Sequence, residues 1–203
     1  AKSALDFLGN LDSKKCLVKV GLELFISEGW KILDLISEKG FEIFLDLKLY
    51  DIPNTVANSI RKISNFNVAL TTIHLNGGKD MVEAAASEKG NIKILGVSIL
   101  TSLSSNDIFK ITNTEFDIYF NNLISIASKN NVDGVVCSPN ELDKLKNFKK
   151  LKVVPGIRND ISNDDQKRVM SSFEAYQKGA DFIVVGRPIT KSDDPRKAAE
   201  LFL

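Results

Sequence analysis

The strongest constraint on the fold is a regular alternation of short β-branched apolar runs with longer helical patterns along all 203 residues. The runs are nearly continuous in apolar residues, which is typical of parallel strands covered on both faces. Successive runs lie about 27 residues apart, which is the βα spacing of a barrel or a doubly wound sheet. The sequence predicts seven strands, over Leu17–Val20, Glu42–Lys48, Leu70–Leu75, Ile94–Leu100, Gly134–Ser138, Lys152–Ile157 and Phe182–Gly186.

Polar residues at the strand ends favour a barrel over an open sheet. A barrel gathers its chemistry at the carboxyl ends of many strands, whereas an open sheet binds ligands at one switch point. No G-x-G-x-x-G string follows an early strand, which argues against a dinucleotide-binding sheet. No linker divides the chain, so we predict one domain over residues 1–203 with the (β/α)8 TIM-barrel fold of the α/β class. The polar strand ends are Lys19, Asp46 with Lys48, His74 with Asn76, Thr101 with Ser102, Arg158, and Gly186 with Arg187.

Seven predicted strands are one fewer than such a barrel needs. Residues Ala1–Asn10 form a helical pattern that leads into the strand of Lys19. The βα rhythm therefore places the first strand before Ala1, and we expect the native chain to begin earlier. We also expect the strand of Lys19 and the strand Phe182–Gly186 not to pair with each other.

Composition narrows the partners and the compartment. The net charge is +1, which indicates neither nucleic-acid binding nor attraction to a membrane surface. The apolar runs are far too short to span a membrane, and Cys16 and Cys137 stand far apart in apolar runs, as reduced thiols do. We predict a cytoplasmic protein. His74 is the only histidine and has no clustered cysteine or carboxylate, so we predict no metal site.

The segment Phe44–Thr55, FLDLKLYDIPNT, is the most informative part of the sequence. Alternation along a strand puts Asp46 and Lys48 on one face. Asp51 follows just past the strand end, and Lys19 is a further charge inside an apolar run. Charged groups are costly to bury without partners, so the segment indicates either a catalytic network or a structural ion pair within the barrel.

Two segments near the end of the chain, VVPGIR and VGRPIT, are typical of phosphate-binding loops. Barrels often hold a phosphate in the loops after their last two strands. Gly156 and Gly186 would let backbone amides approach a ligand, and Arg158 or Arg187 would supply forked donors. Ordinary turns with solvated arginines remain the alternative.

Together these segments resemble the bacterial type of orotidine 5′-phosphate decarboxylase. The matching strings lie in the family's order and span most of the chain. They are KVG at Lys19–Gly21, DLKLYDIPNT at Asp46–Thr55, LTS at Leu100–Ser102, DGVVCS at Asp133–Ser138, PGIR at Pro155–Arg158, DDQKR at Asp164–Arg168 and VGRPIT at Val185–Thr190.

The resemblance implies decarboxylation of orotidine 5′-monophosphate to uridine 5′-monophosphate without a metal or organic cofactor. It implies an alternating charge array with Lys48 as the proton donor to C6, in a homodimer whose Asp51 reaches the partner's site. The catalytic array would be Lys19, Asp46, Lys48 and Asp51. The substrate-binding residues would be Ile52 and Thr55 at the shared edge, Thr101 at the pyrimidine, and Arg158, Gln166, Gly186 and Arg187 around the phosphate.

The chain departs from the family pattern at Tyr50, where a histidine is usual, and at Leu75–Asn76, where small residues are usual. We expect neither to carry proton transfer, and we expect His74 to be a hydrogen-bonded, largely structural residue. Two other functions stay open. One is a Mg²⁺-dependent phosphosugar decarboxylase or aldolase on a related barrel, and the other is a non-catalytic barrel that binds a phosphoribosyl ligand.

Overall fold

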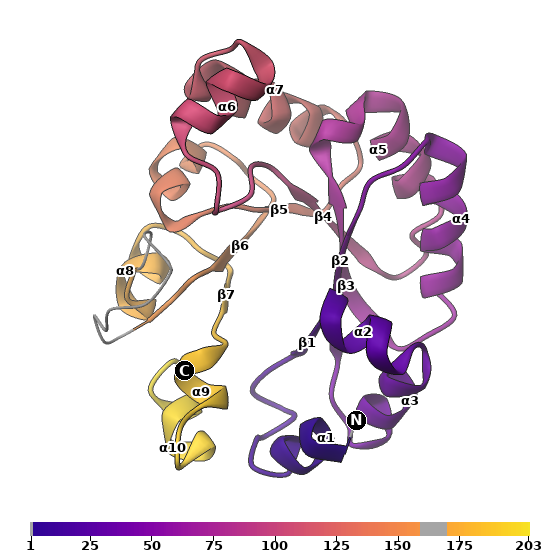
Figure 1. Cartoon of the computed structure of the whole chain (residues 1–203), viewed down its shortest axis with the longest axis vertical. Helices are drawn as coiled ribbons and strands as arrows, with labels where there is room; N and C mark the ends of the chain where they lie inside the picture. Colours follow the sequence, from indigo (N-terminus) through magenta and orange to yellow (C-terminus); the bar gives the residue numbers. More distant parts are fainter. Residues whose placement is uncertain (1, 159–169) are drawn as a thin grey trace.

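Seven parallel strands form one curled sheet in the computed structural model, which describes residues 2–158 and 170–203. The strands neighbour one another in chain order, and the sheet bends into an arc with helices along its outer side (Figure 1). Each predicted strand is confirmed, with ends shifted by a few residues. Their bounds are β1 Val18–Gly21, β2 Ile43–Leu49, β3 Val68–His74, β4 Lys93–Val97, β5 Gly134–Val136, β6 Leu151–Pro155 and β7 Phe182–Val184.

Helices follow nearly every strand, as the alternating pattern predicts. Pro53 opens α4, where its missing N–H costs nothing, and Ser104 caps α6 by a reciprocal capping box with Asp107. The helices are α1 Lys2–Leu8, α2 Leu22–Glu28, α3 Lys31–Glu38, α4 Pro53–Ile63, α5 Gly78–Ser87, α6 Ser105–Thr112, α7 Phe116–Lys129, α8 Ser172–Gln177, α9 Arg187–Thr190 and α10 Pro195–Glu200, with short 3₁₀ turns η1 Leu75–Gly77 and η2 Pro139–Leu145.

Two apolar clusters lie on the two faces of the sheet. The larger cluster packs the outer face against the helices and includes Ile43 and Leu45 of β2. The smaller cluster contains Phe44, Leu70, Leu95 and Val153, which come from four different strands. Since alternate residues of a strand share a face, the smaller cluster fills the inner side of the arc, and Asp46, two residues after Phe44, points to the same side.

The strands β1 and β7 are the two edges of the described sheet and do not pair with each other. This confirms the predicted lack of pairing, and Figure 1 shows them at opposite ends of the arc. Helices α1 and α10 lie near each other across this open side. A small cavity of about 50 Å³ is lined both by residues 10–16 and by residues from Arg196 to Leu203.

None of the helices in the described ranges is long and apolar enough to cross a membrane.

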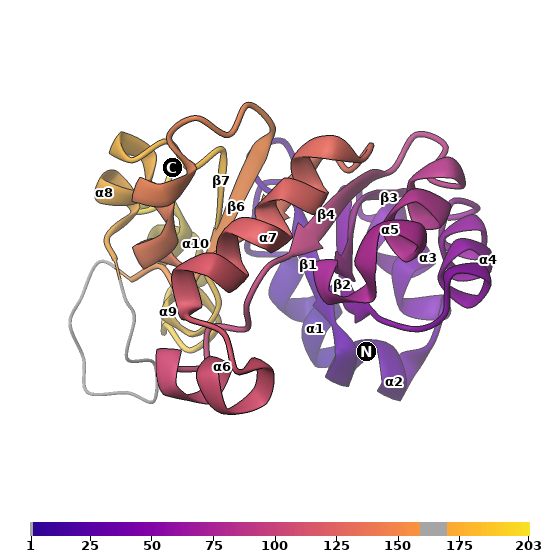
Figure 2. The same cartoon turned by 90° about the horizontal axis from the view of Figure 1, so that it is seen from above.

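Figure 2, seen from above, shows α7 running across the outer side of the sheet.

Candidate active site

The strand β2 is distorted at the residues that carry charge. Leu45 is in register with Thr71 and Leu49 with Ile73, so three residues of β2 lie opposite the single residue Thr72 of β3. Lys48 sits within this bulge with a φ of 52°. A left-handed conformation costs a side-chain-bearing residue about 1–2 kcal/mol, and such outliers persist where the surroundings hold them. The predicted meeting of Asp46 and Lys48 therefore occurs, but through a bulge and not through regular alternation.

Asp46 is the centre of a compact charged cluster at the carboxyl end of the sheet. Lys48 Nζ donates to both carboxylate oxygens, at 2.8 and 2.7 Å, and Lys19 Nζ lies 3.6 Å from Oδ2. The Thr72 hydroxyl donates to Oδ1 at 2.9 Å. The Asp46 side chain is only 12% exposed, whereas about a third of each lysine side chain stays exposed. The carboxylate is thus fixed by two hydrogen-bond donors, Lys48 and Thr72, and by an ion pair with Lys19. Both ammonium groups stay within reach of a ligand, because each lysine side chain is partly exposed.

Gly21 makes room for the Lys19 ammonium. It pairs with Asp46 across β1 and β2, and a Cβ at this position would lie 3.3 Å from Lys19 Nζ. Lys19 and Gly21 share one face of β1. Because Gly21 has no side chain, the Lys19 ammonium can lie over its backbone and reach toward Asp46.

His74 is the last residue of β3 and lies on the inner face of this strand, next to the cluster. Its Nδ1 atom is buried with no hydrogen-bond partner among the described residues, which contradicts the prediction of a hydrogen-bonded histidine. Burial, and secondly the positive charge of Lys48, lower its pKa below the usual value, while Asp46 acts in the opposite sense. The centroids of the Tyr50 ring and the imidazole lie 5.7 Å apart. The surroundings of His74 therefore favour the neutral form of its ring, and its Nδ1 atom is left without a partner among the described residues.

Asp51 lies apart from this cluster. Its carboxylate accepts from the Ile52 backbone N–H at 2.7 Å, and it forms no ion pair with a described residue of its own chain. Ile52 is 67% exposed, and Thr55 is also exposed. The three residues form an exposed rim beside the cluster.

Three of the predicted phosphate residues, Arg158, Gly186 and Arg187, follow the later strands β6 and β7. Gly186 precedes α9 and Arg187 begins it, and a Cβ at Gly186 would meet nothing within 4 Å. The Arg158 backbone N–H donates to the Met170 carbonyl at 3.0 Å. Thr101 is exposed in the turn after β4. Gln166 lies outside the described residues.

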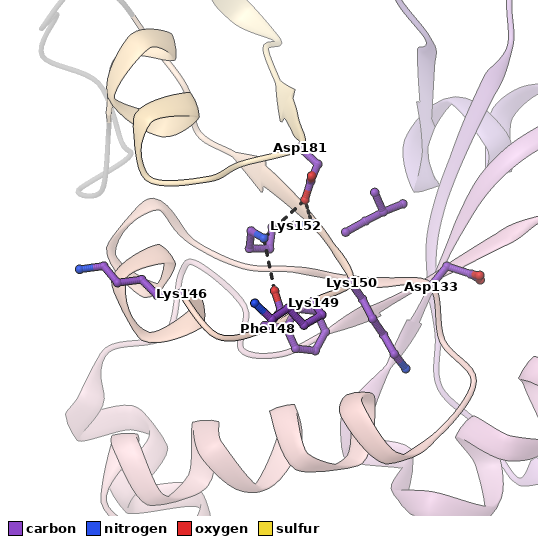
Figure 3. Close-up of a pocket in the computed structure, with 8 residues that line it drawn as sticks. Asp133, Lys146, Phe148, Lys149, Lys150, Lys152 and Asp181 are labelled. Carbon is purple, nitrogen blue, oxygen red and sulfur yellow. Dashed lines mark hydrogen bonds and ion pairs between the residues drawn. The ribbon is translucent and has the colours of Figure 1, made fainter.

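A lysine-rich cavity of about 550 Å³ lies at the opposite, amino-terminal end of the sheet. Its lysines do not converge on a common point, since Lys146 and Lys150 point in different directions (Figure 3). Lys150 Nζ donates to the carbonyls of Ala127 and Asn130 at 2.8 and 2.6 Å, and Asp181 accepts from the Lys152 backbone N–H at 2.7 Å. Residues at this end of a barrel usually serve stability, and these contacts tie loops to strand starts.

The comparisons with known proteins show the family of the chain. Residues 1–202 match the model of the orotidine 5′-phosphate decarboxylase / HUMPS family. The chain belongs to this family. It is 38% identical to orotidine 5′-phosphate decarboxylase of Wigglesworthia glossinidia brevipalpis, over 100% of this chain and 91% of that protein. It is 42% identical to the same enzyme of Oenococcus oeni, over 99% and 93%.

Solved structures of the family share the fold. The crystal structure of orotidine 5′-phosphate decarboxylase from Lactobacillus acidophilus has a TM-score of 0.87 and 32% identity, and covers 99% of this chain and 92% of that one. The family assignment and the barrel-type fold predicted from the sequence are thus both confirmed. The family relatives named above are carbon–carbon lyases.

Sequence reasoning did not select Thr72 or assign a function to Gly21. Thr72 could have been found, because a hydroxyl two residues after the apolar Leu70 in a buried strand shares its inward face. The distances of both residues to the cluster depend on pairing with neighbouring strands, which the sequence pattern does not give.

Proposed function

We propose that this chain decarboxylates orotidine 5′-monophosphate to uridine 5′-monophosphate, with Lys48 as the proton donor. The observation that carries the proposal is the Lys48 ammonium held at 2.7 and 2.8 Å by both oxygens of Asp46. A cation fixed in advance is what a reaction that develops negative charge requires. The family of the chain supports the same reaction.

In the proposed reaction the bond between C6 of the pyrimidine and its carboxylate breaks. Carbon dioxide leaves, and the electron pair stays on C6. Lys48 transfers a proton to C6 to give the product, and its neutral amine then regains a proton from solvent. Asp46 keeps the ammonium in place, and Lys19, 3.6 Å from the same carboxylate, adds a second positive charge near the developing anion.

The remaining predicted residues bind the substrate away from the reacting carbon. We assign the phosphate to Arg187, Arg158, Gln166 and the Gly186 amide, and the pyrimidine ring to Thr101. Binding energy from a remote phosphate can orient the ring over the lysines. The open space around Gly186 and the position of Arg187 at the carboxyl end of β7 support this assignment.

We further propose a homodimer in which Asp51 enters the partner's site, with Ile52 and Thr55 at the shared edge. The exposure of Asp51 and Ile52 beside the cluster supports this arrangement. Inactive Lys48→Ala and Asp51→Ala chains should then complement each other when mixed and exchanged. Each heterodimer contains one intact site, so random exchange should restore about a quarter of wild-type activity. Mixed dimers as inactive as their parents would rule out shared sites.

The test of the function is consumption of orotidine 5′-monophosphate by the purified chain, followed by ultraviolet absorbance with and without a chelator. We expect turnover in both samples. Loss of activity with the chelator, restored by Mg²⁺, would favour the phosphosugar lyase, and binding without turnover would favour the non-catalytic barrel. Independence of cofactors, a single domain over residues 1–203 and a cytoplasmic location stay predictions.

A further inference from the structure

Thr72 joins the two strands where β2 is distorted. Its hydroxyl donates to Asp46 Oδ1 at 2.9 Å and accepts from the Lys48 backbone N–H at 2.8 Å. The residue is completely buried, so water does not compete for either bond, and both are stronger than they would be at the surface. One hydroxyl thus holds the carboxylate oxygen and also the backbone that carries the ammonium.

The bulge explains why a side chain is needed at this place. Three residues of β2 lie opposite Thr72, and a bulge leaves backbone groups without their ladder partners. A buried N–H must find another acceptor. The Thr72 oxygen is that acceptor for the backbone N–H of Lys48. This bond from β3 helps to hold the Lys48 backbone at its φ of 52°.

We propose that Thr72 is a positioning residue for the decarboxylation, acting through Asp46 and Lys48 without touching the substrate. This inference rests on the proposed function, because it requires Lys48 to deliver the proton. Without the hydroxyl, Asp46 loses one of its donors and the Lys48 backbone loses its acceptor. The ammonium then leaves the position from which it reaches C6.

Thr71 offers a matched control on the same strand. It is also completely buried, and its hydroxyl donates to the Leu45 carbonyl at 3.0 Å. Its side chain lies on the opposite face of β3, away from the charged cluster. Thr71→Val therefore removes a buried hydroxyl bond between the same two strands and leaves Asp46 and Lys48 untouched.

The experiment compares Thr72→Val, Thr72→Ser and Thr71→Val. It measures kcat and KM for orotidine 5′-monophosphate, and exchange of the C6 hydrogen of 5-fluorouridine 5′-monophosphate in D₂O by NMR. That exchange runs proton transfer in reverse, with Lys48 as the base. Thr72→Val should lower kcat and the exchange rate about 10- to 100-fold, as expected for hydrogen bonds to charged groups, with KM little changed. Thr72→Ser should restore most of both rates.

Each outcome decides the inference. If the wild type turns over and Thr72→Val matches Thr71→Val in kcat and exchange, the positioning role is wrong and the proposed function stands. If the wild type neither turns over nor exchanges, the proposed function fails and the inference fails with it. Should Thr72→Val not fold, Thr72→Ala against Thr72→Ser makes the same comparison, since these two variants differ only by the hydroxyl.

Discussion

The two halves of the curled sheet are built differently. The strands β2 and β3 have seven residues each. Here Asp46 is held by hydrogen bonds from Lys48 and Thr72 at 2.7 to 2.9 Å and by an ion pair with Lys19 of β1 at 3.6 Å. In the later half, β5 and β7 have three residues each, and Thr101 and Gly186 stand exposed where β4 and β7 give way to loops. The early half is organised by its own side chains, whereas the later half has exposed groups at its strand ends, where we propose that the substrate binds.

This contrast predicts which substitutions change the rate of the chemical step and which change substrate affinity. Groups preorganised toward developing charge act on the chemical step, and groups that contact a remote part of the substrate act mainly on binding. Substitutions of the charged cluster and its hydrogen-bond partners in β2 and β3 should therefore lower kcat, and substitutions after β7 should raise KM.

The largest effect is expected for Lys48→Ala. Loss of the proposed proton donor should lower kcat by at least about 10²–10⁴-fold, while nucleotide binding stays measurable by calorimetry. Lys93→Ala is the control, because it removes an exposed lysine at the start of β4. Equal losses of binding and rate in Lys48→Ala would erase the distinction between the two halves.

Arg187→Ala should mainly weaken substrate binding and change the rate less. Loss of the proposed charge-assisted phosphate contact should raise KM about 10- to 100-fold, with a smaller change in kcat, in steady-state kinetics. Arg196→Ala is the matched control, since its guanidinium is paired only loosely with Glu200 at 3.9 Å on α10. A fall in kcat with KM unchanged would assign Arg187 to the chemical half.

His74 is the only histidine of the chain, so its NMR titration reports on the electrostatics around Lys48. Because burial and Lys48 lower the pKa of His74, its NMR titration midpoint should lie below the usual 6.5 or so. Lys48→Met removes a positive charge and should raise the midpoint. Since the unfolded chain takes up the proton more readily, stability should fall as pH drops below about 6.5. A midpoint at or above that value would contradict the burial of the ring beside Lys48.

The smallest effect is expected for Gly21→Ala. The new methyl would lie 3.3 Å from Lys19 Nζ, so the flexible lysine end must shift by a few tenths of an ångström. We expect kcat to fall about 2- to 5-fold, by analogy with the cost of misplaced catalytic groups. Gly9→Ala creates a similar contact, 3.2 Å from the Asp6 carbonyl oxygen, and should leave kcat unchanged. An equal change in both variants would point to a general loss of packing.

Much of the candidate site follows from the sequence pattern, but its geometry does not. Apolar runs and their spacing predicted all seven strands, and the contact of Asp46 with Lys48 was expected from alternation. The bulge that leaves Lys48 at positive φ was not expected, and neither was the orphaned Nδ1 of His74. Both depend on how β2 and β3 pair, which joins residues more than twenty positions apart.

The sequence by itself determined the element order, the barrel class and the inward-facing charges, because periodicity and the cost of burying charge are local properties of a chain. Only the tertiary structure decided which donors reach Asp46. It placed Thr72 against the bulge and Lys19 over Gly21, and it kept Asp51 outside the cluster of its own chain. The physical reason is register. A shift of one or two residues between neighbouring strands changes every contact across them, and only long-range pairing fixes that shift.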